Sequence, residues 1–168
     1  MGLDMYLSSL PKIEGMSFED ILNVEVRLFQ LEKEDPALFL KVKGHIKHFE
    51  EKEIGLSWEG IRTELGYWRK ANQIHHWFVE NVQDGQDDCS SYEVKRCQAL
   101  DLYNYCEMIL TGKAKAYDIL PTMPGFFFGS TDYDDYYFHE LQRTKDIIAP
   151  LLNSDAFEKN FICYQSSW

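Results

Sequence analysis

The two ends of the chain share a pattern in which apolar and polar positions alternate. Residues 2–8 read Gly-Leu-Asp-Met-Tyr-Leu-Ser, and residues 161–168 are typical of a second strand. Alternation places successive side chains on opposite faces of a sheet. Helical patterns lie between the two ends. We therefore predict an α+β fold, a single domain in which a small, mostly antiparallel sheet includes both terminal strands and packs against several helices.

Two helices are predicted in the first third of the chain. Ser17 opens a capping-box sequence and predicts a helix to about residue 33. Residues 24–28 also alternate like a strand, and a helix would place Glu25 on its apolar face, so a partly extended segment stays open as an alternative. The pair Asp35-Pro36 predicts the start of the next helix, which Gly55 would end.

The densest chemistry of the chain lies in residues 66–78, where aromatic rings, cations, an amide and two imidazoles are crowded together. A short strand is predicted before it, at residues 58–65, and we assign residues 67–80 to one helix. By helical spacing, one stripe faces the core, the next carries Trp68, Asn72 and His75, and Arg69 and His76 lie nearer solvent. A flat ring could stack on the tryptophan or the arginine while the amide and imidazole groups contact its polar edge.

Further helices are predicted at about 95–111 and 132–152, with a polar loop at 81–91. Phe126-Phe127-Phe128 predicts a strand that runs into the last helix, where Ser130 or Thr131 would be the N-cap. Free backbone N–H groups at a helix start can bind an anion such as phosphate. The candidate ligand-binding residues are therefore Trp68, Arg69, Asn72, His75, His76, Ser130, Thr131 and Tyr133. For each of them, a packed or capping role is the alternative.

Charge limits the classes of partner. The formal net charge is −11 and the pI about 4.8, which disfavours direct contact with a nucleic-acid backbone. The same charge permits an acidic surface that occupies a basic groove of another protein. No metal site, catalytic motif or cofactor motif is predicted. Exposed tyrosines at 133, 136 and 137 would allow a homo-oligomer.

The chain is expected in the cytoplasm. Its start lacks a basic region and a long apolar run, so we predict no signal peptide, and no stretch has the apolar length of a membrane span. The cysteines form no CxxC pair, which favours reduced thiols in a reducing compartment.

Four blocks resemble a family of small proteins from bacteriophages and from bacteria that carry them. The blocks are MGLDMYL, GYWRKANQIHHWFVENVQDGQDDC, LPTMPGFFFGSTDYDDYYFHEL and YQSSW, which cover roughly half of the chain. The family has no settled biochemical activity. Residues 8–57 lie outside the blocks and are interpreted as a helical insertion of one or two helices in the 1–168 domain. The resemblance implies a phage or prophage origin and the cytoplasm of the host cell. His76 stands where the family pattern is expected to have Lys.

Three functions are compatible with these features. The first is a non-catalytic binder of a small, nucleotide-like ligand, which for a phage protein could mean sequestering a host immune signal. The second is an acidic inhibitor that binds a host defence complex, as a DNA mimic or an anti-CRISPR-like protein would. The third is an enzyme of unknown chemistry that uses His75 and a carboxylate. The aromatic, cationic and amide groups of residues 66–78 favour the first.

Overall fold

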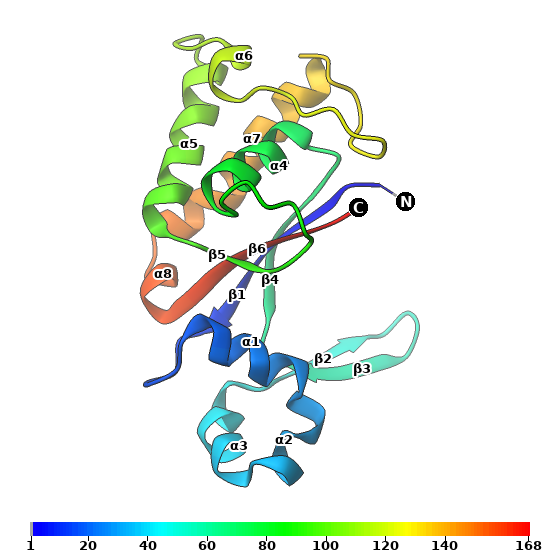
Figure 1. The fold of residues 1–168 in the computed structure, drawn as a ribbon, viewed down its shortest axis with the longest axis vertical. Coiled ribbons are helices and arrows are strands. Elements are labelled where there is room, and N and C mark those ends of the chain that lie inside the picture. The colour runs from blue at the N-terminus through cyan, green and yellow to red at the C-terminus, as the bar shows by residue number, and fades with distance from the viewer. Residues whose placement is uncertain (1) are drawn as a thin grey trace.

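The centre of the molecule is a four-stranded antiparallel sheet. The structure is a computed structural model and describes residues 2–168. The strands follow the order β4-β1-β6-β5. They comprise β1 (Asp4–Pro11), β4 (Thr63–Arg69), β5 (Tyr92–Val94) and β6 (Asn160–Ser167). Asp4 lies opposite Ser167, which brings the two chain ends side by side (Figure 1). The predicted α+β fold with both terminal strands in one sheet is confirmed.

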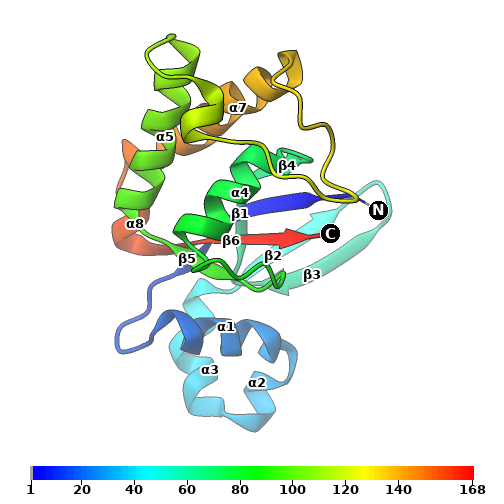
Figure 2. The ribbon, with the colours of Figure 1, turned by 45° about the horizontal axis from the view of Figure 1, so that its top comes forward.

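Helices cover one face of this sheet, above it in Figure 2. They are α4 (Asn72–Asn81), α5 (Arg96–Leu110), α6 (Ala116–Ile119) and α7 (Asp135–Leu152), while the short α8 (Ala156–Lys159) lies at the end of the sheet where β6 begins. The larger hydrophobic cluster fills the space between them and the sheet. In α7, Leu141, Ile148 and Leu151 share one helical stripe and are buried in that cluster. Of its polar side chains, Glu140 and Thr144 are also buried, whereas Gln142, Arg143 and Asp146 are exposed.

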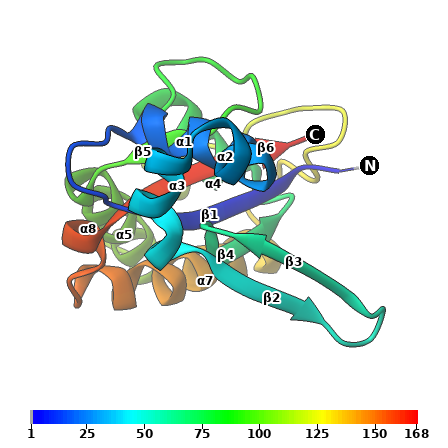
Figure 3. The same ribbon diagram turned by 90° about the horizontal axis from the view of Figure 1, so that it is seen from below.

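Residues 12–62, which we name the connecting segment, join β1 to β4 on the opposite side of the sheet (Figure 3). The segment contains α1 (Phe18–Val26), α2 (Leu28–Glu34), α3 (Pro36–Val42), η1 (Lys43–His45), β2 (Lys47–Glu51) and β3 (Leu56–Gly60). Its helices bury a second, smaller apolar cluster that includes Ile21, Leu31 and Ile61. Because β1 continues to Pro11, the chain leaves the sheet after residue 11, beyond the predicted boundary at residue 8.

The helix starts of the connecting segment follow the sequence signals, whereas its later elements do not. Ser17 forms the predicted capping box, but the helix breaks at Arg27. Asp35 caps α3, yet α3 ends at residue 42 and the predicted helix to residue 54 is wrong there. A β-hairpin replaces it, and Gly55 serves its turn with φ +63°.

Arg62 fastens the connecting segment to the sheet. Its guanidinium binds both carboxylate oxygens of Glu25 at 2.6 and 2.7 Å, and donates to Ser8 Oγ and Cys163 Sγ at 2.9 Å each. Ser8 and Cys163 belong to paired strands, while Glu25 belongs to α1. A helical α1 therefore carries Glu25 on its sheet-facing side because a partly buried cation, Arg62, pairs with it there.

Three further predicted elements differ. The helix assigned to residues 67–80 is instead the end of β4 followed by α4, with the turn at Lys70, whose φ is +58°. Residues 126–128 form a turn rather than a strand. The last long helix begins at Asp135, and its N-cap is Asp134, whose carboxylate accepts from the N–H of Tyr137.

Candidate functional site

Trp68 belongs to the core and not to a ligand surface. It lies in β4 with 0 % of its surface exposed. Its indole Nε1 donates to Thr144 Oγ1 at 2.9 Å, and its ring meets Phe78 edge to face at 6.1 Å. The expectation that Trp68 lines a concave surface is wrong, because strand alternation turns its side chain inward toward α7.

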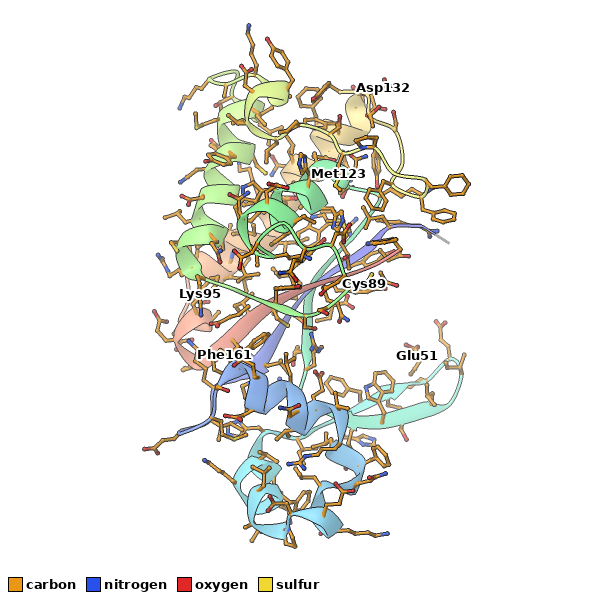
Figure 4. The ribbon with its side chains drawn as sticks, viewed as in Figure 1. Glu51, Cys89, Lys95, Met123, Asp132 and Phe161 are labelled. Carbon is orange, nitrogen blue, oxygen red and sulfur yellow. The ribbon has the colours of Figure 1, made fainter. Side chains whose placement is uncertain are left out.

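Asn72 organises the loop that crosses α4. Its amide nitrogen donates to the carbonyl oxygens of Phe128 and Ser130 at 3.0 and 2.7 Å, and its amide oxygen accepts from the N–H of Met123 at 3.0 Å. Met123 lies beside α4 in Figure 4. Asn72 is buried and both groups of its amide are engaged in hydrogen bonds, so the expectation that it lines a concave surface is wrong.

His75 is enclosed, contrary to its expected exposure on the site. Its Nε2 lies 3.0 Å from Asp87 Oδ2 and its Nδ1 lies 2.7 Å from the hydroxyl of Tyr164. Because a carboxylate only accepts, Nε2–H donates to Asp87 and Nδ1 accepts from Tyr164. Burial lowers the pKa of His75 below its ordinary value, although Asp87 acts in the opposite direction. His75 is therefore a neutral structural histidine without an open path to a substrate.

Four other candidates are exposed but do not form one site with the buried ones. Arg69 lies in solvent at the end of β4. Ser130 Oγ accepts from the N–H of Asp132 and donates to its carboxylate, both at 3.0 Å, so it closes a local turn and does not cap α7. Thr131 and Tyr133 are also exposed. The expectation that Tyr137 is exposed at an oligomer surface is wrong, because Tyr137 is buried.

A groove lies between α4 and the segment that follows α6. Its cavity volume is about 180 Å³. Figures 1 and 2 show this segment crossing α4. The lining residues are Gln73, His76, Trp77, Glu80, Asn81, Ile119, Leu120 and Pro121. Ligand pockets for drug-sized molecules usually measure roughly 300–1,000 Å³. This groove therefore accepts one ring-sized group and leaves the rest of a larger ligand outside.

One of the predicted residues lines this groove, and two others contact neighbours of its lining residues. His76 lines it, and its Nδ1 lies 3.2 Å from the carbonyl oxygen of Pro121. Thr131 does not line the groove; its carbonyl oxygen accepts a hydrogen bond at 3.1 Å from the hydroxyl of Thr122, which follows Pro121 in the chain. The ring of Tyr133 packs edge to face on Tyr137 at 5.0 Å. The hydroxyl of Tyr137 in turn donates to the Leu120 carbonyl at 2.8 Å.

Trp77 supplies the most unusual group of the groove. The residue is buried, and its indole Nε1 has no hydrogen-bond partner among the described residues. An unpaired buried donor costs on the order of 1–3 kcal/mol. Gln73, Trp77 and Glu80 fall on one stripe of α4, a pattern that was already readable within the predicted helix of residues 67–80.

Two negative findings concern residues 2–168. Within this range, no cluster of three or more His, Cys, Asp or Glu side chains is placed to hold a metal ion. Among the helices described, none combines the length and the apolar character needed to cross a membrane.

Comparison of the chain with family models, curated proteins and solved structures finds no match. The site must therefore be interpreted from its own geometry.

Proposed function

We propose that the protein is a phage-type accessory protein that binds a small, nucleotide-like ligand without transforming it. The planar ring of the ligand would enter the groove between α4 and the segment after α6. The observation that carries this proposal is a ring-sized groove lined by Trp77, whose buried indole N–H has no hydrogen-bond partner among the described residues. A ring nitrogen or carbonyl that accepts from this N–H would remove the cost of leaving it unpaired.

The remaining lining groups suit the edge of a nucleobase. The carbonyl oxygen of Pro121 only accepts, so Nδ1–H of His76 donates to it and Nε2 is left as an acceptor. Glu80 and Asn81 add exposed oxygens at the same rim. These acceptors favour a ring with exocyclic amino groups, while the apolar side chains of Ile119 and Leu120 cover its face. The carboxylate of Glu80 would direct phosphate groups away from the rim and into solvent.

We propose binding without a reaction because of the residues that line the groove. None of the residues that line it carries a hydroxyl or a thiol that could act as a nucleophile. The pair of His75 and Asp87, which an enzyme hypothesis would use, is engaged in hydrogen bonds with Tyr164 and Trp168. The resemblance to phage proteins supports a role in which binding alone is useful, such as removing a host immune signal.

Calorimetry with nucleosides, nucleoside monophosphates and cyclic nucleotides tests the proposal. Trp77→Phe keeps the ring but removes the N–H, so it should weaken binding by about tenfold, the effect of about 1.4 kcal/mol. The same substitution should leave the free protein as stable or more stable, since it removes an unpaired donor. Trp68→Phe is the matched control, because it removes an indole N–H that is already paired with Thr144.

Two results would overturn the proposal. One is that no member of the panel binds and that mass spectrometry of the denatured protein finds no co-purified small molecule. The other is that Trp77→Phe binds a ligand as tightly as the parent protein, which would place the ligand elsewhere.

A further inference from the structure

The connecting segment displays an unusual amount of exposed apolar surface. Phe29 is 83 % exposed and Trp58 is 47 % exposed. Other large exposed apolar side chains of the segment are Val26, Leu40, Ile54 and Leu56. The hairpin of β2 and β3 projects from the body, with Glu51 near its far end (Figures 3 and 4). A two-stranded hairpin is marginal by itself and needs packing against something.

Two adjoining hollows lie where this hairpin meets α1, α2 and α3. Their volumes are about 450 and about 420 Å³. They share Leu28, Trp58 and Glu59, so the tryptophan stands between them. Its ring stacks on Phe49 at 5.5 Å with an interplanar angle of 15°. Phe49 therefore supports Trp58 as a fixed aromatic ridge with space on both sides.

The free charge of the hollows is negative. Arg62 lines one of them, but Glu25 already neutralises it through two hydrogen bonds. Glu59 and Glu64 line the same hollow, and neither has an ion-pair partner in the part of the chain that the structure describes. Phe39 lines the other hollow, and Nζ of Lys43 lies over its ring, 5.9 Å from the ring centroid. The acidic end thus complements a cation, and the net charge of −11 acts in the same direction.

We propose that this surface docks a basic, amphipathic segment of another protein. Apolar anchors of the partner would enter the two hollows on either side of Trp58, and a Lys or Arg would meet Glu59 and Glu64. Exposed tryptophan between pockets is typical of an interface hot spot, and rim charge steers the encounter. A second copy of this chain fits less well because it would bring like charges together. The surface lies across the sheet from the groove of Trp77, so the two activities can be tested separately.

Fluorescence anisotropy with two synthetic helical peptides tests this inference. The first carries Leu on one face and Lys on the other, and the second replaces each Lys by Glu. The Lys peptide should bind, and Trp58→Ala should weaken its binding by about tenfold or more, as loss of an aromatic hot spot does. The double variant Glu59→Gln with Glu64→Gln should weaken binding several-fold and reduce its dependence on salt. The Glu peptide should not bind.

Phe126→Ala is the matched control. Phe126 is also a large exposed apolar residue, but it lies in the turn of residues 125–128, outside the connecting segment, so its loss should leave binding unchanged. Circular dichroism checks that every variant stays folded. Equal binding of the two peptides, or undiminished binding by Trp58→Ala, would overturn the inference. So would sedimentation showing a dimer that Trp58→Ala dissociates, because the surface would then serve a second copy.

Discussion

His75 Nε2 donates to Asp87 Oδ2 at 3.0 Å, and this bond fastens the loop after α4 to the helix itself. The other carboxylate oxygen of Asp87 accepts from the indole of Trp168 at 2.9 Å. The second nitrogen of His75 reaches Tyr164 in β6. One buried imidazole and one carboxylate therefore join α4, the loop of residues 82–91 and the C-terminal strand. The arrangement resembles part of a catalytic triad, but burial gives it a structural role.

The protein should lose stability as the pH falls below about 6.5, the ordinary pKa of histidine. Burial lowers the pKa of His75 in the folded state, so the unfolded chain binds more protons in this range. The stabilisation is fully present above pH 6.5 and is lost as the pH falls through the folded pKa. Urea unfolding at several pH values measures it. His75→Asn should flatten the slope between pH 7 and 5.5, whereas His48→Asn, on the exposed hairpin, should keep it. Equal slopes in both variants would contradict the assignment.

Glu140 should make the stability depend on pH in the direction opposite to that of His75. Its side chain is buried in α7, and Oε2 has no hydrogen-bond partner among residues 2–168. Burial raises the pKa of Glu140, although Arg143 and His139 act against the shift. A raised folded pKa means that stability is present at low pH and falls as the pH rises through that value. Glu140→Gln removes the charge at nearly constant volume.

The expected gain for Glu140→Gln at pH 7.5 is about 1–3 kcal/mol in the free energy of unfolding, the usual cost of an unpaired buried polar group. The gain should shrink toward pH 5. Glu107→Gln is the control, since it disrupts only a partly exposed ion pair with Lys145. A loss of stability in Glu140→Gln would show that the carboxylate has a favourable partner in the folded state.

The parts of the fold that local patterns dictate were readable from the sequence. Alternation identified both terminal strands, and the capping signals at Ser17 and Asp35 marked two helix starts. The strand predicted at residues 58–65 overlaps β3, but the first strand of the hairpin was missed because its residues also fit the helical stripe that ends at Phe49. Its extended state depends on cross-strand contacts such as that between Phe49 and Trp58, which a local pattern does not reveal.

The candidate site was only partly predictable for a similar reason. Residues 66–78 do concentrate unusual chemistry, but the strand-to-helix turn at Lys70 sits inside them. That turn points Trp68 and His75 inward, where they bind groups more than 70 residues away in the chain. His76 lines the groove as expected of a residue nearer solvent. Trp77 was overlooked because no local pattern shows that Ile119, Leu120 and Pro121 lie against its stripe of the helix.

Substitutions of the neighbouring residues Trp68 and Arg69 should differ strongly in their effect on stability. Trp68→Ala removes a fully buried ring and should cost about 3–5 kcal/mol in the free energy of unfolding. Arg69→Ala alters an exposed side chain and should change stability by less than about 0.5 kcal/mol. Thermal and urea unfolding of both variants measure this difference. A folded Trp68→Ala variant with unchanged stability would show that the ring is not the core element described.

The bond between Arg62 and Glu25 should control how firmly the connecting segment is held. Arg62→Met leaves Glu25 half-buried without its cation and removes a donor from Ser8 and Cys163, so a loss of about 1–3 kcal/mol is expected. Because the cluster beneath the segment is the smaller of the two, amide exchange and proteolysis should accelerate first in residues 12–62. Arg27→Met, at an exposed helix end, is the control and should change neither the stability nor the exchange and proteolysis of residues 12–62.

Adding Glu25→Met to Arg62→Met should restore part of the lost stability, since it removes the carboxylate that the first substitution leaves unpaired. Uniform acceleration over the whole chain would instead show that the two clusters unfold together and that Arg62 stabilises the molecule as one unit.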